Sequence, residues 1–321
     1  MIIFIYTVLV FLVLRFSVTL FNFLSNPKMG NYGRRFTDQV SLIIKVEREK
    51  SEADELLASI AAQDYKHLQI IIQYGTSPFS PEEATGDYFL FLGANTLLKN
   101  GFIHSLIYRT KVFNLALLSV IPTQRNTGLL ANCIYPLADF VLLNLFPLRL
   151  VRLINHPVFA TANESCLFFD AAVYRQFKWE ERIKRSASRA VEIVKMVKQE
   201  GLKADVLLGN RLIYFGEKQL EPGFLPFSRR LMLNFSNNIL AAVLYLILVI
   251  AGPIVLAIEL EPALLVLPLG LIFLSRVMTS FLSAQHPVTN VLLHPLQMLA
   301  LVLLLFSNIW NRVFSGPGDK K

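Results

Sequence analysis

The first third of the chain contains three polar side chains that could bind a ligand, and each comes after a short apolar stretch. They are Lys45, Gln73 and Asn95. A lysine ammonium is a fixed positive charge that can stabilise a diphosphate. A glutamine amide both donates and accepts hydrogen bonds. An asparagine carbonyl is neutral, so it is a weaker ligand for a hard divalent cation than a carboxylate is. These residue types favour the binding of an anion over the binding of a metal ion.

The apolar stretches before these side chains have the length and composition of buried β-strands. Residues 40–44, 68–72 and 88–92 are short runs rich in β-branched or aromatic side chains. Between the first two runs, Leu56, Leu57 and Ile60 recur at helical spacing. The order strand, helix, strand, strand predicts an α/β domain.

This order, together with the residues that follow each strand, resembles the family 2 glycosyltransferases, whose domain has the GT-A fold. In that family the first strand ends in a Pro-x-x-Asn-Glu-like turn, the second in paired aspartates and the third in Asp-x-Asp. The matching positions here are residues 45–49, with Glu49 retained, then Gln73-Tyr74 and Gly93-Ala94-Asn95. The resemblance covers residues 38–235 and implies a GT-A fold in which Gln73 still hydrogen-bonds to a uracil edge.

The resemblance also implies a divalent cation, which an intact member of the family uses to neutralise the leaving diphosphate. Gly93 and Ala94 bring no side-chain oxygen to the Asp-x-Asp position, and Asn95 brings only a neutral one. We therefore expect no metal site at these residues and predict no cofactor.

A second part of the resemblance lies between residues 159 and 201. Asn163 matches the Asn of the family's Ala-Asn-Gly-Gln segment, where Glu164 and Ser165 replace Gly-Gln. The helix that follows normally begins with Glu-Asp, which supplies the general base, but Arg189 and Ala190 stand there. Alanine cannot take a proton, and a positioned base contributes about 10²–10⁴-fold to a rate. Glu192 faces another direction on a helix, because only residues three or four apart share a face.

These departures leave three hypotheses about function. The first is a catalytically degenerate transferase-like protein that binds a lipid, a nucleotide or a partner glycosyltransferase. The second is a divergent, metal-independent transferase in which Lys45, Arg48 or Arg189 stabilises the diphosphate of a nucleotide sugar and a lipid accepts the sugar. The third is a structural subunit of a cell-envelope assembly. By resemblance, the candidate residues of the donor pocket are Lys45, Glu49, Gln73, Asn95, Asn163 and Arg189, with no catalytic residue assigned.

The ends of the chain predict a membrane protein. Hydrophobic residues make up 54% of the sequence, which is more than an ordinary soluble domain contains. Residues 1–24 are almost continuously apolar apart from Arg15, and residues 238–260, 263–283 and 288–310 are three further candidate spans. A cleaved signal peptide is the alternative for the first of these, but no basic segment precedes the apolar run. A buried arginine in a membrane requires a partner helix or a route to the surface.

Basic residues beside these spans predict the orientation. Lys28, Arg34 and Arg35 follow the first span, and Arg229 and Arg230 precede the second. The positive-inside rule then places the central domain in the cytosol. We expect the membrane to be the plasma (inner) membrane. We expect an anchor at residues 1–25, a cytosolic domain at 30–235, about three membrane segments within 238–310 and a tail at 311–321.

Two further stretches each allow two interpretations. Residues 129–153 are apolar and end with Arg149 and Arg152, so they form either a segment that rests on the membrane or a buried core helix. Residues 178–198 carry seven basic side chains, which form either a solvated helix face or a surface for anionic lipid head groups. The formal net charge is +8, but exposed aromatic residues are not interleaved with the basic ones, so a nucleic-acid partner is not expected. The two cysteines, Cys133 and Cys166, suit small buried positions.

Overall fold

The computed structural model describes residues 1–46, 50–75, 79–125, 128–183, 188–216 and 224–314. The chain divides into two compact units, and its path passes between them several times. One unit contains residues 1–26, 126–147 and 220–321, and the other contains residues 27–125 and 148–219. We call them the helical unit and the sheet unit.

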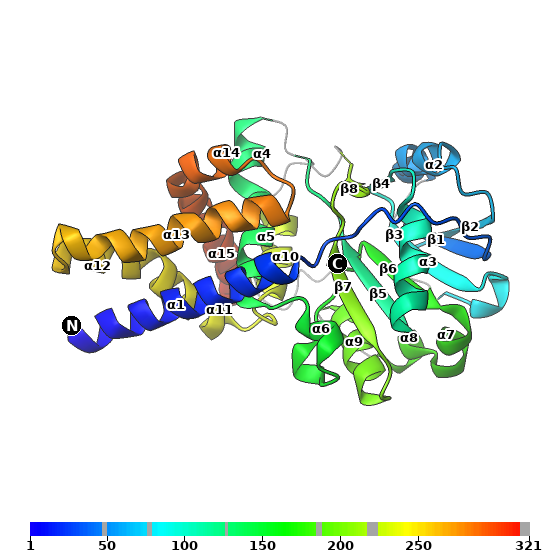
Figure 1. Ribbon diagram of the computed structural model, residues 1–321, viewed down its shortest axis with the longest axis horizontal. Helices are drawn as coiled ribbons and strands as arrows, with labels where there is room; N and C mark the ends of the chain where they lie inside the picture. The colour runs from blue at the N-terminus through cyan, green and yellow to red at the C-terminus, as the bar shows by residue number, and fades with distance from the viewer. Residues whose placement is uncertain (47–49, 76–78, 126–127, 184–187, 217–223, 315–321) are drawn as a thin grey trace. The chain divides into compact units, whose positions relative to one another are not determined.

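A six-stranded sheet forms the centre of the sheet unit (Figure 1). Its strand order is β2-β1-β3-β6-β5-β7, and β6 is the one strand that runs antiparallel to its neighbours. The three apolar stretches of the sequence form β1, β2 and β3, so the predicted α/β fold is confirmed, and the structure adds that the sheet is mostly parallel. The bounds are β1 Val40–Val46, β2 Leu68–Tyr74, β3 Tyr88–Gly93, β5 Leu117–Ile121, β6 Cys166–Asp170 and β7 Ala204–Leu208.

Helices cover both faces of this sheet. Leu56 and Ile60 of α2 and Phe102 and Leu106 of α3 pack in one apolar core with alternate residues of β1 and β3. On the other face, the aromatic rings of Phe91 in β3 and Phe169 in β6 contact Tyr174 of α7. The Phe169 ring also contacts Trp179 of α8. The helices of this unit are α2 Asp54–Ala61, α3 Phe102–Phe113, α6 Leu150–Leu153, α7 Ala171–Phe177, α8 Trp179–Arg182 and α9 Arg189–Gln199. A separate two-stranded sheet pairs β4 Thr96–Leu98 with β8 Ile213–Phe215.

The strand order reverses beside β1. From β1 the chain next forms β2 on one side and then β3 on the other. In open α/β sheets, ligands bind outside the carboxyl ends of the strands at such a switch point. The sheet topology alone therefore directs attention to the ends of β1 and β3, which carry Lys45 and Gly93.

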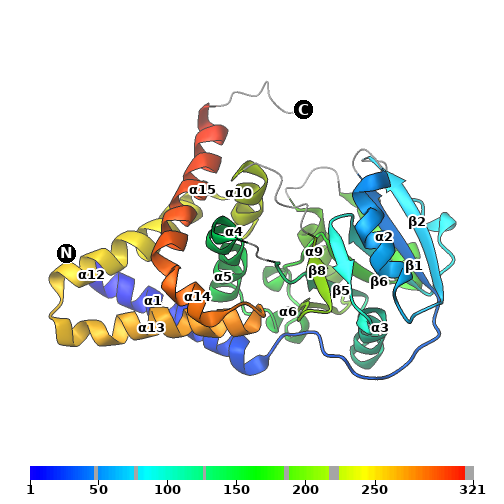
Figure 2. The same ribbon diagram turned by 90° about the horizontal axis from the view of Figure 1, so that it is seen from above.

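The helical unit contains three helices long and apolar enough to cross a membrane, within the described part of the chain: Ile2–Ser25, Ile239–Glu259 and Pro262–Leu282. The predicted last segment, 288–310, is not one helix, because it is divided between α14 and α15 at Leu293. Pro295 explains the division, since proline has no N–H to donate to the oxygen of Val291 and suits the first turn of a new helix. The elements are α1 Ile2–Ser25, α4 Leu129–Ile134, α5 Pro136–Leu145, α10 Phe224–Leu233, α11 Ile239–Leu246, η5 Ile247–Ala251, α12 Gly252–Glu259, α13 Pro262–Leu282, α14 Pro287–Leu292 and α15 His294–Phe314 (Figure 2).

The apolar stretch 129–153 is not a single segment. Its α4 and α5 belong to the helical unit, and its α6 belongs to the sheet unit. Leu137, Phe140 and Val141 of α5 are buried in the core of the helical unit, against Leu231 of α10 and Leu301 of α15. Of the two interpretations, the buried core helix describes α5.

Arg15 has partners inside the helical unit. Its guanidinium donates a hydrogen bond to Asn144 Oδ1 at 3.3 Å, and it lies 5.3 Å and 5.4 Å from the ring centroids of Phe140 and Tyr245. An amide oxygen and aromatic faces offset part of the cost of removing the cation from water. Of the two alternatives for Arg15, a partner helix or a route to the surface, the structure shows partner helices, α5 and α11.

These contacts predict that Arg15 stabilises the helical unit. In Arg15→Ala the Asn144 oxygen loses its donor, and the free energy of unfolding should fall by about 1–3 kcal/mol. Leu14→Ala is the matched control, because the Leu14 side chain on the same helix is 60% exposed. Thermal unfolding of the full chain in detergent would compare the two. Equal losses in both variants would contradict a specific role for Arg15.

Candidate functional site

Lys45, Gln73 and Gly93 lie side by side at the carboxyl edge of the sheet. In the parallel pairing, Lys45 of β1 is the register partner of Gln73 in β2 and of Gly93 in β3. The Lys45 side chain is exposed, and its Nζ lies 5.3 Å from the ring centroid of Phe91. Register partners project from the same face of a sheet. Two of the six residues predicted for the donor pocket, Lys45 and Gln73, are therefore neighbours.

The turn after β3 carries no acidic group. Gly93 ends the strand, and the exposed Asn95 stands in the tight turn before β4. The backbone oxygen of Asn95 accepts a hydrogen bond from the Gly216 N–H at 2.7 Å. A Cβ added at Gly93 would meet the Ser165 Cα at 3.6 Å, an ordinary contact. Packing therefore does not exclude a side chain, such as an aspartate, at this position.

The described residues at this edge do not fit a divalent cation. Within the described ranges, no three His, Cys, Asp or Glu side chains gather in a way that could hold a metal ion. Mg²⁺ and Mn²⁺ prefer several oxygen ligands, carboxylates above all. Glu49, the acid retained by resemblance, lies outside the described residues.

Asn163 holds the loop that precedes β6. Its side-chain Oδ1 accepts a hydrogen bond from the Ser165 N–H at 2.9 Å, and its own N–H donates to Ser119 Oγ at 2.8 Å. The Ser165 oxygen in turn accepts from the Gly93 N–H at 3.0 Å. Asn163 thus shapes a loop that lies directly beside the end of β3. The Asn163 side chain contacts the nearby Ser165, and the hydrogen bond between Gly93 and Ser165 places residues 163–165 beside the candidate site.

The N-terminus of α9 lies against the same loop. Ser188 caps the helix by accepting a hydrogen bond from the Val191 N–H, Arg189 is exposed and Ala190 is buried. The Ala190 N–H donates to the Glu164 Oε1 at 3.5 Å. Glu164 is therefore a carboxylate beside the position where the resemblance expects a base. Our sequence prediction did not assign it a role, although an acid where the family has glycine is visible in the sequence.

Glu192 of α9 and Glu200, which follows this helix, have cationic partners. Glu192 Oε1 lies 2.8 Å from Lys195 Nζ, and Glu200 Oε1 lies 2.9 Å from Arg182 Nη1. Lys198 of the same basic stretch is buried and donates to the Ile154 oxygen at 2.7 Å. Several cations of residues 178–198 are thus engaged within the protein, while residues 184–187 lie outside the described part.

Arg149 and Arg152 belong to a cationic cluster of the sheet unit. The fully buried Asp205 accepts hydrogen bonds from Arg109 at 3.0 Å and 2.7 Å, and Arg152 Nε lies 3.5 Å from the same oxygen. Burial lowers the pKa of Arg149 and Arg152, the nearby Asp205 carboxylate raises it, and neighbouring guanidinium groups lower it further. Because a buried carboxylate requires compensation, the cluster is structural around Asp205.

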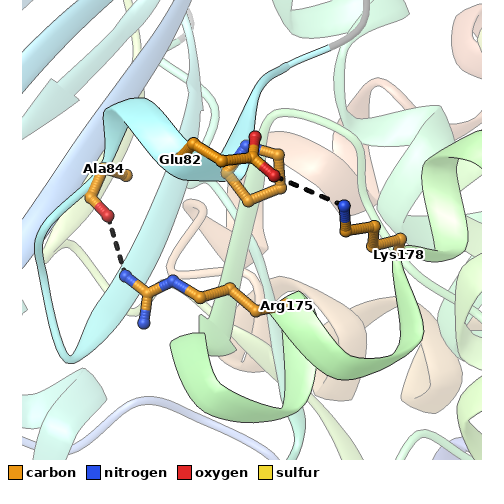
Figure 3. A pocket seen from close by; sticks show the side chains of 5 residues that line it. Glu82, Ala84, Arg175 and Lys178 are labelled. Carbon is orange, nitrogen blue, oxygen red and sulfur yellow. Dashed lines mark hydrogen bonds and ion pairs between the residues drawn. The ribbon is translucent and has the colours of Figure 1, made fainter.

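A cavity of about 450 Å³ lies elsewhere in the sheet unit, between Pro81, Glu82, Ala84, Arg175 and Lys178 (Figure 3). Arg175 donates to the Ala84 oxygen at 2.7 Å, and Lys178 Nζ lies 3.3 Å from Glu82 Oε1. Both cations are thus engaged within the protein. Arg175 follows the carboxyl end of the antiparallel β6, so the cavity lies at the edge opposite to Lys45. No candidate residue from the sequence lines it.

Comparison of the sequence with protein-family models gives no match, and comparison with curated proteins gives none either. Solved structures do give matches. The chain is similar to the mannosyltransferase PcManGT from Pyrobaculum calidifontis, solved in complex with GDP-Man and Mn²⁺, with 12% identity, a TM-score of 0.48 and coverage of 96% of this chain and 99% of that chain. It is also similar to S. aureus TarS 1-349 in complex with UDP-GlcNAc, with 11% identity, a TM-score of 0.38 and coverage of 86% and 92%.

Proposed function

We propose that this chain is a membrane-anchored protein of the GT-A fold, related to the family 2 glycosyltransferases, that binds a nucleotide sugar without a divalent cation. The observation that carries the proposal is the row formed by Lys45, Gln73 and Gly93 at the switch point of the sheet. It presents a cation and an amide to a ligand, and no carboxylate.

The chemistry of this row suits the charged part of a nucleotide sugar. The Lys45 ammonium is placed to offset the charge of the diphosphate, as a fixed cation does where a metal ion is absent. Gln73, one strand away, offers an amide to the edge of a base such as uracil. Arg189, exposed at the start of α9, adds a second cation near Glu164 and Ala190.

We further propose that metal-dependent sugar transfer is lost and that binding is the function that remains. The Asp-x-Asp position holds Gly93, Ala94 and Asn95, the base position holds Ala190, and Glu192 is paired with Lys195. Such a protein would serve cell-envelope or lipid glycan assembly at the plasma membrane, with the sheet unit in the cytosol, next to a membrane lipid or a partner glycosyltransferase. The basic residues Lys28, Arg34 and Arg35 after α1 support this orientation.

A metal-independent transferase with a lipid acceptor is the second candidate. The contact between Glu164 and the first turn of α9 favours it, because it supplies one carboxylate beside Ala190. Nucleotide-sugar binding is common to both candidates, and it is therefore the property to measure first.

The first prediction concerns the cation. Full-length protein in detergent, with EDTA present, should bind UDP or GDP, and Lys45→Ala should weaken this binding about tenfold, equivalent to about 1.4 kcal/mol. Lys203→Ala is the matched control, because Lys203 is exposed just before β7, at the opposite edge of the same sheet. Isothermal titration calorimetry gives both affinities. If both lysine variants bind as the wild type does, Lys45 does not hold the diphosphate.

The second prediction concerns the metal. Millimolar Mn²⁺ should leave the nucleotide affinity of the wild type unchanged, because the turn after β3 has no carboxylate. The double variant Gly93→Asp, Asn95→Asp should bind nucleotide at least tenfold more tightly with Mn²⁺ than with EDTA, since space is available at Gly93. Asn95→Asp alone is the control and should gain less. A tenfold tightening in the wild type would show that other carboxylates form a metal site and would refute the proposal.

A further inference from the structure

Glu164 is the acidic side chain that the structure brings to the candidate site. Residue 164 comes one position before Ser165, whose oxygen accepts the hydrogen bond from the end of β3 at Gly93. The antiparallel β6 begins two residues later and pairs Cys166 with Leu92. Glu164 therefore stands at the carboxyl edge of the parallel strands, the same edge that carries Lys45.

The backbone around Glu164 is fixed on both sides. Asn163 exchanges hydrogen bonds with Ser119 of β5, and Ser165 is bonded to Asn163 Oδ1 and to Gly93. The carboxylate itself receives the Ala190 N–H of α9 at 3.5 Å. A helix N-terminus favours a negative charge. The loop thus fixes the backbone on both sides of residue 164, and the exposed carboxylate contacts the first turn of α9.

Glu164 has no cationic partner among the described residues, unlike the acids around it. Glu192 and Glu200 are paired with Lys195 and Arg182. A carboxylate has about four lone-pair positions, and the single contact to Ala190 uses one of them. The remaining positions are open to donors from a ligand, and hydroxyl groups are donors of this kind.

We propose that Glu164 binds the hydroxyl groups of the sugar in the ligand, an inference that rests on the proposed nucleotide-sugar function. Two strand spacings, from β1 through β3 to the loop before β6, separate Lys45 from this loop, which is about 10 Å. One ligand can then place an anionic group at Lys45 and hydroxyl groups at Glu164. The cation recognises the diphosphate, and the acid distinguishes a nucleotide sugar from a bare nucleotide.

The test compares each nucleotide with its sugar derivative on the full-length protein, in detergent with EDTA. The probes are UDP with UDP-glucose and UDP-GlcNAc, and GDP with GDP-mannose. In the wild type, at least one sugar derivative should bind about tenfold more tightly than its nucleoside diphosphate. Glu164→Ala should abolish this difference and leave the affinity for the bare nucleotide unchanged, and Glu164→Gln should retain part of it, because the amide oxygen still accepts a hydrogen bond.

Glu83→Ala is the matched control, since Glu83 is also exposed but belongs to the segment before β3, at the opposite edge. It should leave all affinities unchanged. If the wild type binds each nucleotide and its sugar derivatives equally, or if Glu164→Ala preserves the difference, the role of Glu164 is refuted while nucleotide binding stands. If the wild type binds no probe at all, the proposed function fails and the inference fails with it.

Discussion

The pairing of β1 with β2 on one side and with β3 on the other determines what the carboxyl edge of the sheet presents. Each strand has a single favourable register, because alternate residues fill two different cores. Leu42 and Ile44 face α2 and α3, while Ile43 and Lys45 project from the opposite face, where Phe91 meets Tyr174. A slip by one residue would exchange the two faces and bury Lys45 in an apolar core. The row of Lys45, Gln73 and Gly93 is thus a consequence of how the sheet buries its apolar side chains.

The charge at this edge limits the chemistry that the protein can perform. A diphosphate needs positive charge in its vicinity, and in the proposed site Lys45 would supply it instead of a metal ion held by carboxylates. A fixed ammonium binds a phosphate but cannot polarise it from several sides as a divalent cation does. This difference is the reason that we propose recognition without rapid transfer as the function. In the proposed site, Glu164 would add an acceptor for hydroxyl groups, and the edge would then contact the anionic and the sugar parts of one ligand separately.

The sequence predicts the regular elements well because their signals are local. The apolar runs at 40–44, 68–72 and 88–92 correspond to β1, β2 and β3, and the helix expected to begin at Arg189 and Ala190 is α9. Arg15 was expected to need a partner helix or a route to the surface, and Asn144 of α5 supplies the first of these. Composition also indicated membrane helices, of which three are long and apolar enough within the described residues.

Long-range features were harder to predict because they depend on pairing between distant segments. Nothing local indicates that α5 joins the helical unit while α6 joins the sheet unit, since both come from one apolar stretch. The division of residues 288–310 at Leu293 follows from Pro295, yet a hydropathy average does not detect it. The place of Glu164 depends on the antiparallel insertion of β6 beside β3, which brings residue 164 to the edge formed by residues 45 and 93. The sequence showed that an acid was present but not where it would lie.

The most direct test of the account is to locate the bound nucleotide on the protein. Hydrogen–deuterium exchange of the full chain in detergent, with EDTA and with saturating UDP or GDP, would report which backbone amides become protected. The account predicts protection of the peptides that contain Lys45, Gln73 and Gly93, with no change around Arg175 and Lys178 at the opposite edge. Protection confined to the cavity of Arg175 and Lys178, or protection that appears only with Mn²⁺, would contradict a metal-free binding site at the carboxyl edge of β1 and β3.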